Sequence, residues 1–196
     1  MVKDVLRDED LLHASDFEGN SALHIAIICN AFDIAEYLVR SGADVNAVNS
    51  RHATSLDLSL DEASLTAYLL TYGAEWTLAA AVRTGHLEQA RSLLEGDPTT
   101  AQQLDAEEHS LLWHAVCGGH TLMVKLLLDH GADPNAPERG AHHGAALHKA
   151  ANLDRREIVD LLLVNGADPN GGVDSSSPPI EYAKENVRRS LLKAGA

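Results

Sequence analysis

Five residues near positions 107 and 142 are of types that could bind a metal or transfer protons. Glu107, Glu108 and His109 fall together in DAEEHS, and His142 and His143 fall in GAHHG. Carboxylates and imidazoles are both ligands of transition metals. Their spacing, however, has no H-x-x-x-H or C-x-x-C regularity of the kind found in zinc sites. We favour a polar, solvated loop tip, and keep a metal-binding or catalytic protein as the alternative.

The chain contains no recognisable motif for nucleophilic catalysis or for nucleotide binding. There is no G-x-S-x-G, no P-loop and no G-x-G-x-x-G that follows an expected strand. The segment GGVDSSSPP (171–179) is rich in turn formers but lacks the lysine of a phosphate-binding loop. Cys29 and Cys117 have no definable catalytic partner, and we interpret both as small buried thiols. We therefore expect no enzyme activity and no cofactor.

Composition and charge narrow the class of partner. The chain has 196 residues, of which 45% are hydrophobic and 4% aromatic, which suits close-packed helices better than a β-sandwich. The net charge of −14 argues against nucleic acid, because phosphate contacts need lysine or arginine. It suits a partner with a basic surface, or simple solubility.

The cellular setting is inferred from what the sequence lacks. The first sixteen residues, MVKDVLRDEDLLHASD, are charged throughout and contain no signal-peptide core. No window approaches 18 uninterrupted apolar residues, so no membrane span is expected. Two cysteines do not imply a disulfide framework, and a reducing compartment is the default. We expect a cytoplasmic monomer.

An internal repeat supplies the elements that must position these residues. The segment GNSALHIAIICNAFDIAEYLVRSGADVN (19–46) returns in altered form as GAALHKAANLDRREIVDLLLVNGADPN (144–170). The equivalent apolar anchors are Leu23, Leu56, Leu78, Leu112, Leu147 and Ile180. The steps between successive anchors are 33, 22, 34, 35 and 33 residues. A period of this length is typical of a solenoid of small repeated units.

Each unit contains signals for two short helices. A hydroxyl residue two positions before the anchor can cap a first helix, as Ser21, Thr54 and Ser110 do in their units. An alanine three positions after the anchor shares its face, and a second helix has apolar residues at helical spacing, such as Ile34 and Leu38. Four glycines then end the second helices: Gly42, Gly73, Gly131 and Gly166. A short polar stretch that can form a hairpin-like finger leads to the next anchor.

One helix pair cannot bury its own apolar face, so neighbouring units must stack to form a continuous core. The sequence therefore predicts an all-α solenoid of helix-turn-helix units with short β-hairpin-like fingers. The expected segments are a partial N-terminal cap at 1–18, repeats at 19–48, 49–75, 76–104, 105–139 and 140–172, and a capping repeat at 173–196.

These units resemble the ankyrin repeat, whose period is about 33 residues and whose signature is T-P-L-H-x-A. The resemblance rests on SALHIA (21–26), AALHKA (145–150), the Gly-His pairs at 85–86 and 119–120, and the endings GADVN (42–46) and GADPN (131–135 and 166–170). It covers about residues 5 to 196. By this resemblance, His24, His148, His86 and His120 have structural roles at the turns.

The largest departure from the pattern lies at residues 73–78, where the finger is missing. Leu78 follows Gly73 almost at once, and the step from Leu56 is only 22 residues. Two readings are open: one continuous stack with a local irregularity, or two blocks at 1–74 and 75–196. We favour the continuous stack, because no Gly/Ser/Pro-rich linker separates the two parts.

The resemblance implies a protein-binding surface made of finger tips and first helices. We expect a non-catalytic module, an adaptor or regulator, that binds a protein partner there. The finger positions are Phe17, Glu18, Asn20, Arg51, Glu107, His109 and His142. The first-helix positions are Ile28, Cys29, Trp113, Cys117 and Asn152. Phe17, Ile28 and Trp113 are the expected anchors, because the repeat register places apolar side chains there in exposed positions.

Overall fold

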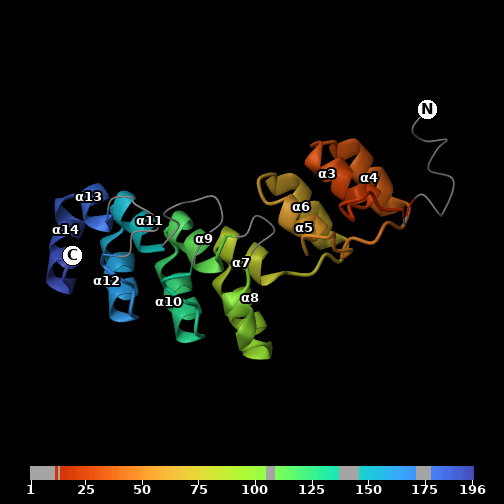
Figure 1. The fold of residues 1–196 in the computed structure, drawn as a ribbon. Coiled ribbons are helices and arrows are strands. Elements are labelled where there is room, and N and C mark those ends of the chain that lie inside the picture. Colours follow the sequence, from red (N-terminus) through yellow and green to blue (C-terminus); the bar gives the residue numbers. More distant parts are fainter. Residues whose placement is uncertain (1–11, 13, 105–108, 137–145, 171–177) are drawn as a thin grey trace. The chain divides into compact units, whose positions relative to one another are not determined.

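The computed structural model shows helices throughout, as the repeat predicts (Figure 1). It describes residues 12, 14–104, 109–136, 146–170 and 178–196. Most of the expected N-terminal cap lies outside these residues. The helices are α3 (Ala22–Ile28), α4 (Phe32–Arg40), α5 (Ser55–Leu58), α6 (Ala63–Thr71), α7 (Leu78–Thr84), α8 (Leu87–Gly96), the 3-10 helix η1 (Pro98–Gln102), α9 (Leu111–Gly118), α10 (Thr121–Asp129), α11 (Ala146–Asn152), α12 (Arg156–Val164), α13 (Pro179–Tyr182) and α14 (Glu185–Ala194).

The predicted capping and stop signals are confirmed. The side chains of Ser21, Thr54 and Ser110 accept hydrogen bonds from the third backbone amides of α3, α5 and α9. The four stop glycines have positive φ angles between 85° and 93°. Only glycine adopts this conformation without steric cost, so each second helix ends where its glycine stands.

The five leucine anchors are buried, as predicted, whereas the last anchor, Ile180, is half-buried. Leu23, Leu56, Leu112 and Leu147 are each at most 1% exposed, and the residues three positions later, alanine in three repeats and Ser59 after Leu56, are buried with them. Ile34 and Leu38 are the apolar residues that the helical spacing of α4 singles out, but only Leu38 is buried. The other buried residues of α4 are Ala35 and Val39, and Ile34 is exposed.

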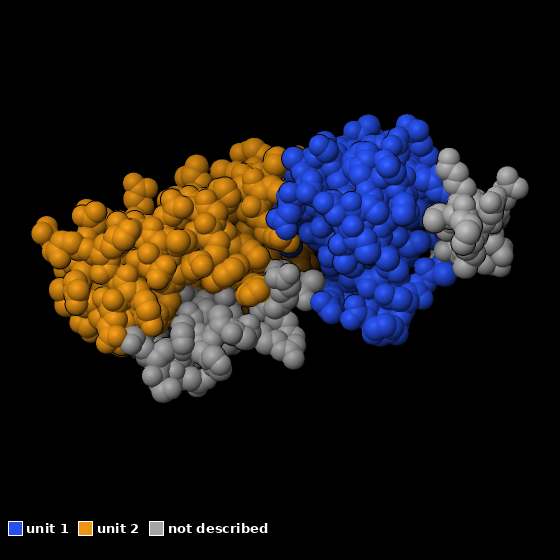
Figure 2. All heavy atoms as spheres, turned by 90° about the horizontal axis from the view of Figure 1, so that it is seen from above, with its two compact units in different colours: residues 1–80 blue, residues 81–196 orange. Residues whose placement is uncertain are grey.

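The chain forms two compact units, residues 1–80 and 81–196, which Figure 2 shows in different colours. In the first unit α3 packs against both α4 and α5, and α5 packs against α6. In the second unit the first helices α9 and α11 pack together, and so do the second helices α8, α10 and α12. The terminal helices α13 and α14 cover α11 and α12. One continuous stack across both units stays a prediction.

The fingers are closed by single antiparallel bridges rather than by strands. These bridges join Ser15 to Ser21, Val48 to Thr54 and Leu104 to Ser110. After α6 the described chain has no such bridge before α7, so the missing finger is confirmed. Thr77 instead caps α7 by accepting a hydrogen bond from the amide of Ala80 and donates one to Asp57. Trp76 packs against the core of the first unit.

Asparagines at the ends of the repeats form side-chain hydrogen bonds to the following repeat. The side chain of Asn135 donates to the carbonyl of Gly166 at 2.9 Å and accepts from the amide of Asp168 at 2.8 Å. Asn46 makes the same pair of bonds with Gly73 and Glu75. Asparagine fits because its amide both donates and accepts. None of the helices in the described segments is long and apolar enough to cross a bilayer.

Candidate functional site: the fingers and first helices

The backbones of the first two fingers are each held by hydrogen bonds, and a further hydrogen bond joins the two fingers. In the first, the carboxylate of Asp16 accepts hydrogen bonds from the amides of Glu18 and Asn20 at 2.9 and 2.8 Å. In the second, Asn49 accepts in the same way from Arg51 and Ala53. The amide of Ser50 donates to the carbonyl of Glu18 at 2.9 Å, which holds the two tips side by side. The backbone of these fingers is therefore fixed before any partner arrives.

The expected finger residues divide into exposed and structural ones. Phe17 is 94% exposed at the tip of the first finger, and Glu18 and Arg51 form a surface ion pair at 3.3 Å. Asn20 is only 5% exposed and accepts a hydrogen bond from the side chain of Asn49. Asn20 therefore does not face a partner: its amide group is used to join the two fingers.

The first helix α3 presents an apolar surface beside the fingers. Ile28 is 59% exposed and Ile25 is 43% exposed, while the intervening Ala26 and Ile27 are buried. Cys29, at the end of α3, is exposed. The interpretation of Cys29 as a buried thiol was therefore wrong, because the cysteine falls on the outer side of the last helical turn. In the first unit the predicted first-helix surface exists and is apolar.

In the second unit, the first helix α9 carries an aromatic residue, Trp113, that neighbouring side chains partly cover. Trp113 is half-buried, and the ring of His109 stacks on it with centroids 4.6 Å apart and an angle of 12°. The ammonium of Lys149, from α11, lies 5.4 Å from the centroid of the Trp113 ring. Trp113 is thus less exposed than an anchor should be, because neighbouring side chains already contact it.

The remaining predicted positions lie near these residues. Cys117 is half-buried on α9, and Asn152 is exposed at the end of α11. Glu107 and His142 lie outside the described residues, as do Glu108 and His143. Within the described part of the chain, no three histidine, cysteine, aspartate or glutamate residues are placed to hold a metal ion. The metal alternative gains no support from the one member that is described, His109.

Two of the four structural histidines tie the helices to their surroundings. His24 is buried and accepts a hydrogen bond from the amide of Ser21 at 3.1 Å. Burial lowers the pKa of His24 below its usual value of 6.5, so the neutral ring is favoured. His120 packs tightly against Gly85 and Gly118. The structural role is therefore supported for His24 and His120.

An aromatic cluster on the second helices of the first unit was not predicted. The rings of Tyr68 and Tyr72 are 4.6 Å apart, and Phe32 meets Tyr68 edge-on at 5.8 Å. Hydrogen bonds from Tyr68 and Arg40 lower the pKa of Tyr72. Tyrosines four residues apart on one helix were the available signal.

Comparison with known proteins agrees with the geometry. Family models for ankyrin repeats match residues 77–171 (three copies) and 18–50. The ankyrin repeat domain-containing protein SAT10 of Stachybotrys chartarum is 26% identical over 205 residues, which cover 94% of this chain and 10% of that protein. The B-cell lymphoma 3 protein homolog of Mus musculus is 32% identical over 190 residues, which cover 89% of this chain and 42% of that protein.

A solved structure shows the same fold. The ankyrin repeat domain of human ASB11 superposes with a TM-score of 0.59 and 23% identity, covering 100% of this chain and 92% of that one. The chain spans less than half the length of the two curated relatives above. Ankyrin repeats are in general non-catalytic modules that bind protein partners. With capped helix pairs, stop glycines and bridged fingers in register, this chain belongs to the ankyrin-repeat family.

Proposed function

We propose that this chain is a non-catalytic adaptor or regulator that holds a protein partner against its fingers and first helices. The observation that carries the proposal is Phe17, which is 94% exposed at the tip of a finger fixed by hydrogen bonds. An exposed aromatic side chain on a hydrogen-bonded finger suits binding, because the backbone that carries it needs little further ordering when a partner docks. Aromatic residues are also enriched among the side chains that dominate interfaces.

A second contribution comes from α3 in the same unit. Ile25 and Ile28 expose apolar side chains on the first helix, whereas the second helix α4 pairs Arg40 with Glu36 at 2.8 Å. A partner that buries Phe17 and Ile28 removes two large apolar side chains from water. Each full burial contributes about 1.5–3 kcal/mol of transfer free energy. These two residues are therefore the anchors we propose for the first unit.

The experiment is a pull-down from a lysate of the source organism with three forms of the chain. The Phe17→Ser/Ile28→Ser double variant should lose the proteins that the unchanged chain retains. The matched control is Val164→Ser, because Val164 is 85% exposed but lies on the second helix α12. The proposal is wrong if all three forms retain the same proteins, or if the control loses as much as the double variant. All three forms should unfold at the same temperature, since the changed side chains are exposed.

A further inference from the structure

A patch on two neighbouring first helices of the second unit has its own chemistry. We define the α9–α11 patch as Trp113, His114 and Cys117 of α9 with Lys149 and Asn152 of α11. The two helices pack against each other, and all five side chains are half-buried or exposed. His114 and Lys149 occupy the same position in successive repeats, two residues after the anchors Leu112 and Leu147. This position holds Ile25 in the first unit, so the patch replaces an apolar surface with a basic one.

Lys149 is the central group of this patch. Its ammonium lies 5.4 Å from the centre of the Trp113 ring, and the ring is itself stacked on His109. His114 meets Trp113 edge-on at 5.0 Å. Within the described segments, no carboxylate forms an ion pair with Lys149. An ammonium has three hydrogen-bond donors, and the face of an aromatic ring accepts none of them as a lone pair would. Among the residues that the structure describes, Lys149 therefore has an aromatic neighbour but no acceptor for its ammonium hydrogens.

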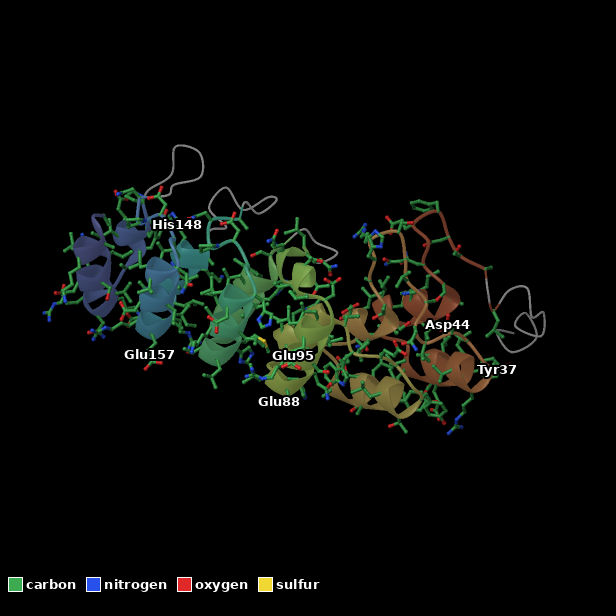
Figure 3. All side chains as sticks on the ribbon, turned by 90° about the horizontal axis from the view of Figure 1, so that it is seen from below. Tyr37, Asp44, Glu88, Glu95, His148 and Glu157 are labelled. Atoms are coloured by element: carbon green, nitrogen blue, oxygen red, sulfur yellow. The ribbon has the colours of Figure 1, made fainter. Side chains whose placement is uncertain are left out.

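Within the described residues, acidic side chains are absent from the helices of the patch, and the first acid after α11 is Asp154. Neither α9 (LLWHAVCG) nor α11 (ALHKAAN) contains an aspartate or glutamate. The acidic residues of the second helices in the same unit are Glu88, Glu95, Asp129, Glu157 and Asp160. Figure 3 shows Glu88, Glu95 and Glu157 on the opposite side of the unit from His148 of α11. The nearest helix beyond α11, α13, contributes one acid, Glu181.

Lys149 is therefore the one lysine, arginine, aspartate or glutamate on α9 and α11, although the net charge of the chain is −14. Salt weakens interactions between exposed charges over about 8 Å at physiological ionic strength. A group docked on the patch thus interacts strongly with the ammonium of Lys149, and weakly with the carboxylates of the second helices on the far side of the helix pair. The net charge governs approach from a distance, whereas the patch governs what docks there.

We propose that the α9–α11 patch binds an acidic segment of the protein partner. A glutamate or aspartate side chain accepts hydrogen bonds from the ammonium of Lys149, and its aliphatic part lies against Trp113. This inference rests on the proposed function and names the chemical class of the partner's segment. It reverses the expectation of a basic partner surface for this part of the chain, because that expectation used the net charge alone.

Fluorescence anisotropy with two labelled peptides tests the proposal. The probes are a short glutamate-rich peptide and a lysine-rich peptide of the same length. The glutamate-rich peptide should bind, and Lys149→Gln should weaken it about tenfold, the usual loss for one charge-assisted hydrogen bond. Lys149→Arg should retain most of the affinity. Lys125→Gln is the matched control, because Lys125 is exposed on α10 and its loss changes the net charge equally.

Four outcomes would overturn the inference. The glutamate-rich peptide could fail to bind, or the lysine-rich peptide could bind more tightly. Lys149→Gln could bind as well as the unchanged chain, or Lys125→Gln could lose as much affinity as Lys149→Gln. Thermal unfolding of each variant establishes that the fold is intact. The pull-down with Phe17 and Ile28 variants reports on the first unit, so its success with a failed peptide experiment would reject only the acidic class.

Discussion

The Nε2 atom of His24 lies 3.2 Å from the carbonyl oxygen of Ala53, which links helix α3 to the finger of the next repeat. The other ring nitrogen, Nδ1, accepts from the amide of Ser21, so the proton resides on Nε2 and the ring is neutral. The side chain is fully buried. One histidine therefore closes the cap of its own helix and positions the neighbouring finger.

This arrangement predicts a loss of stability in acid. Burial lowers the folded-state pKa of His24 below 6.5, so the unfolded chain binds the proton more readily than the folded chain. The stabilisation is complete above pH 6.5 and is lost as the pH falls towards the folded-state pKa. In a Trp113→Phe background, Trp76 fluorescence reports unfolding of the first unit. His24→Gln should flatten the decline between pH 8 and pH 5; parallel curves would contradict the assignment.

The inter-repeat asparagine bonds predict a specific loss in the second unit. Asn135→Ala removes both bonds to the following repeat and should lower the free energy of unfolding by about 1–2 kcal/mol. Asn165→Ala is the control, because Asn165 is equally exposed but bonds only to Leu161 of its own helix. Urea unfolding, followed by Trp113 fluorescence in a Trp76→Phe background, measures both. An equal loss of unfolding free energy in the two variants would contradict a specific stabilising role of the inter-repeat hydrogen bonds.

Two glycines of the second unit should respond to alanine with opposite signs. Gly85 has a φ of +77°, and an added Cβ would lie 2.7 Å from the ring of His120. Gly85→Ala should therefore destabilise by about 1–2 kcal/mol from backbone strain alone. Gly96 ends α8 with no atom within 4 Å of an added Cβ. Gly96→Ala should stabilise by about 0.5 kcal/mol, because alanine favours the helix. Calorimetric unfolding should separate the two variants in opposite directions from the unchanged chain.

Substitutions at Asn20 and at Phe17, both in the first finger, should affect the free energy of unfolding and partner binding differently. Asn20→Ala should lower the free energy of unfolding by about 1–3 kcal/mol, since it leaves partners of a buried amide unsatisfied. Phe17→Ala should change it by less than about 0.5 kcal/mol, because the side chain is exposed. Denaturant unfolding measures both. Should Asn20→Ala leave stability unchanged while weakening partner capture, the original assignment of Asn20 to the binding surface would be restored.

Local signals predicted the fold well where one residue type has one physical role. Ser21, Thr54 and Ser110 cap helices because a hydroxyl can accept from free amides, and Gly42 ends α4 because it tolerates positive φ. The apolar spacing of α4 groups Ile34 with Leu38, yet Ile34 is exposed and Ala35 is buried, because two registers satisfy the same spacing. Which register is used depends on the neighbouring helices, and the sequence of α4 alone does not contain them.

The candidate site was predictable only in outline. The register placed Phe17 and Ile28 on the surface, and both are exposed. It also placed Asn20 there, yet Asn49, 29 residues away, engages its amide. Trp113 was expected to be free, but Lys149 of the following repeat lies over its ring. Contacts between repeats decide these cases, because a side chain at a given position in the unit meets whatever the next unit presents.

The sequence by itself determined that this chain builds capped helix pairs with a finger missing near residue 75, since caps, stops and anchors are local and periodic. Only the tertiary structure decided which polar residues form hydrogen bonds between repeats and which remain exposed. The reason is that hydrogen-bond partners and burial are set by neighbours from other repeats. Asn20 and Asn152 are both polar surface candidates in the sequence, yet Asn20 is buried against Asn49 whereas Asn152 is exposed.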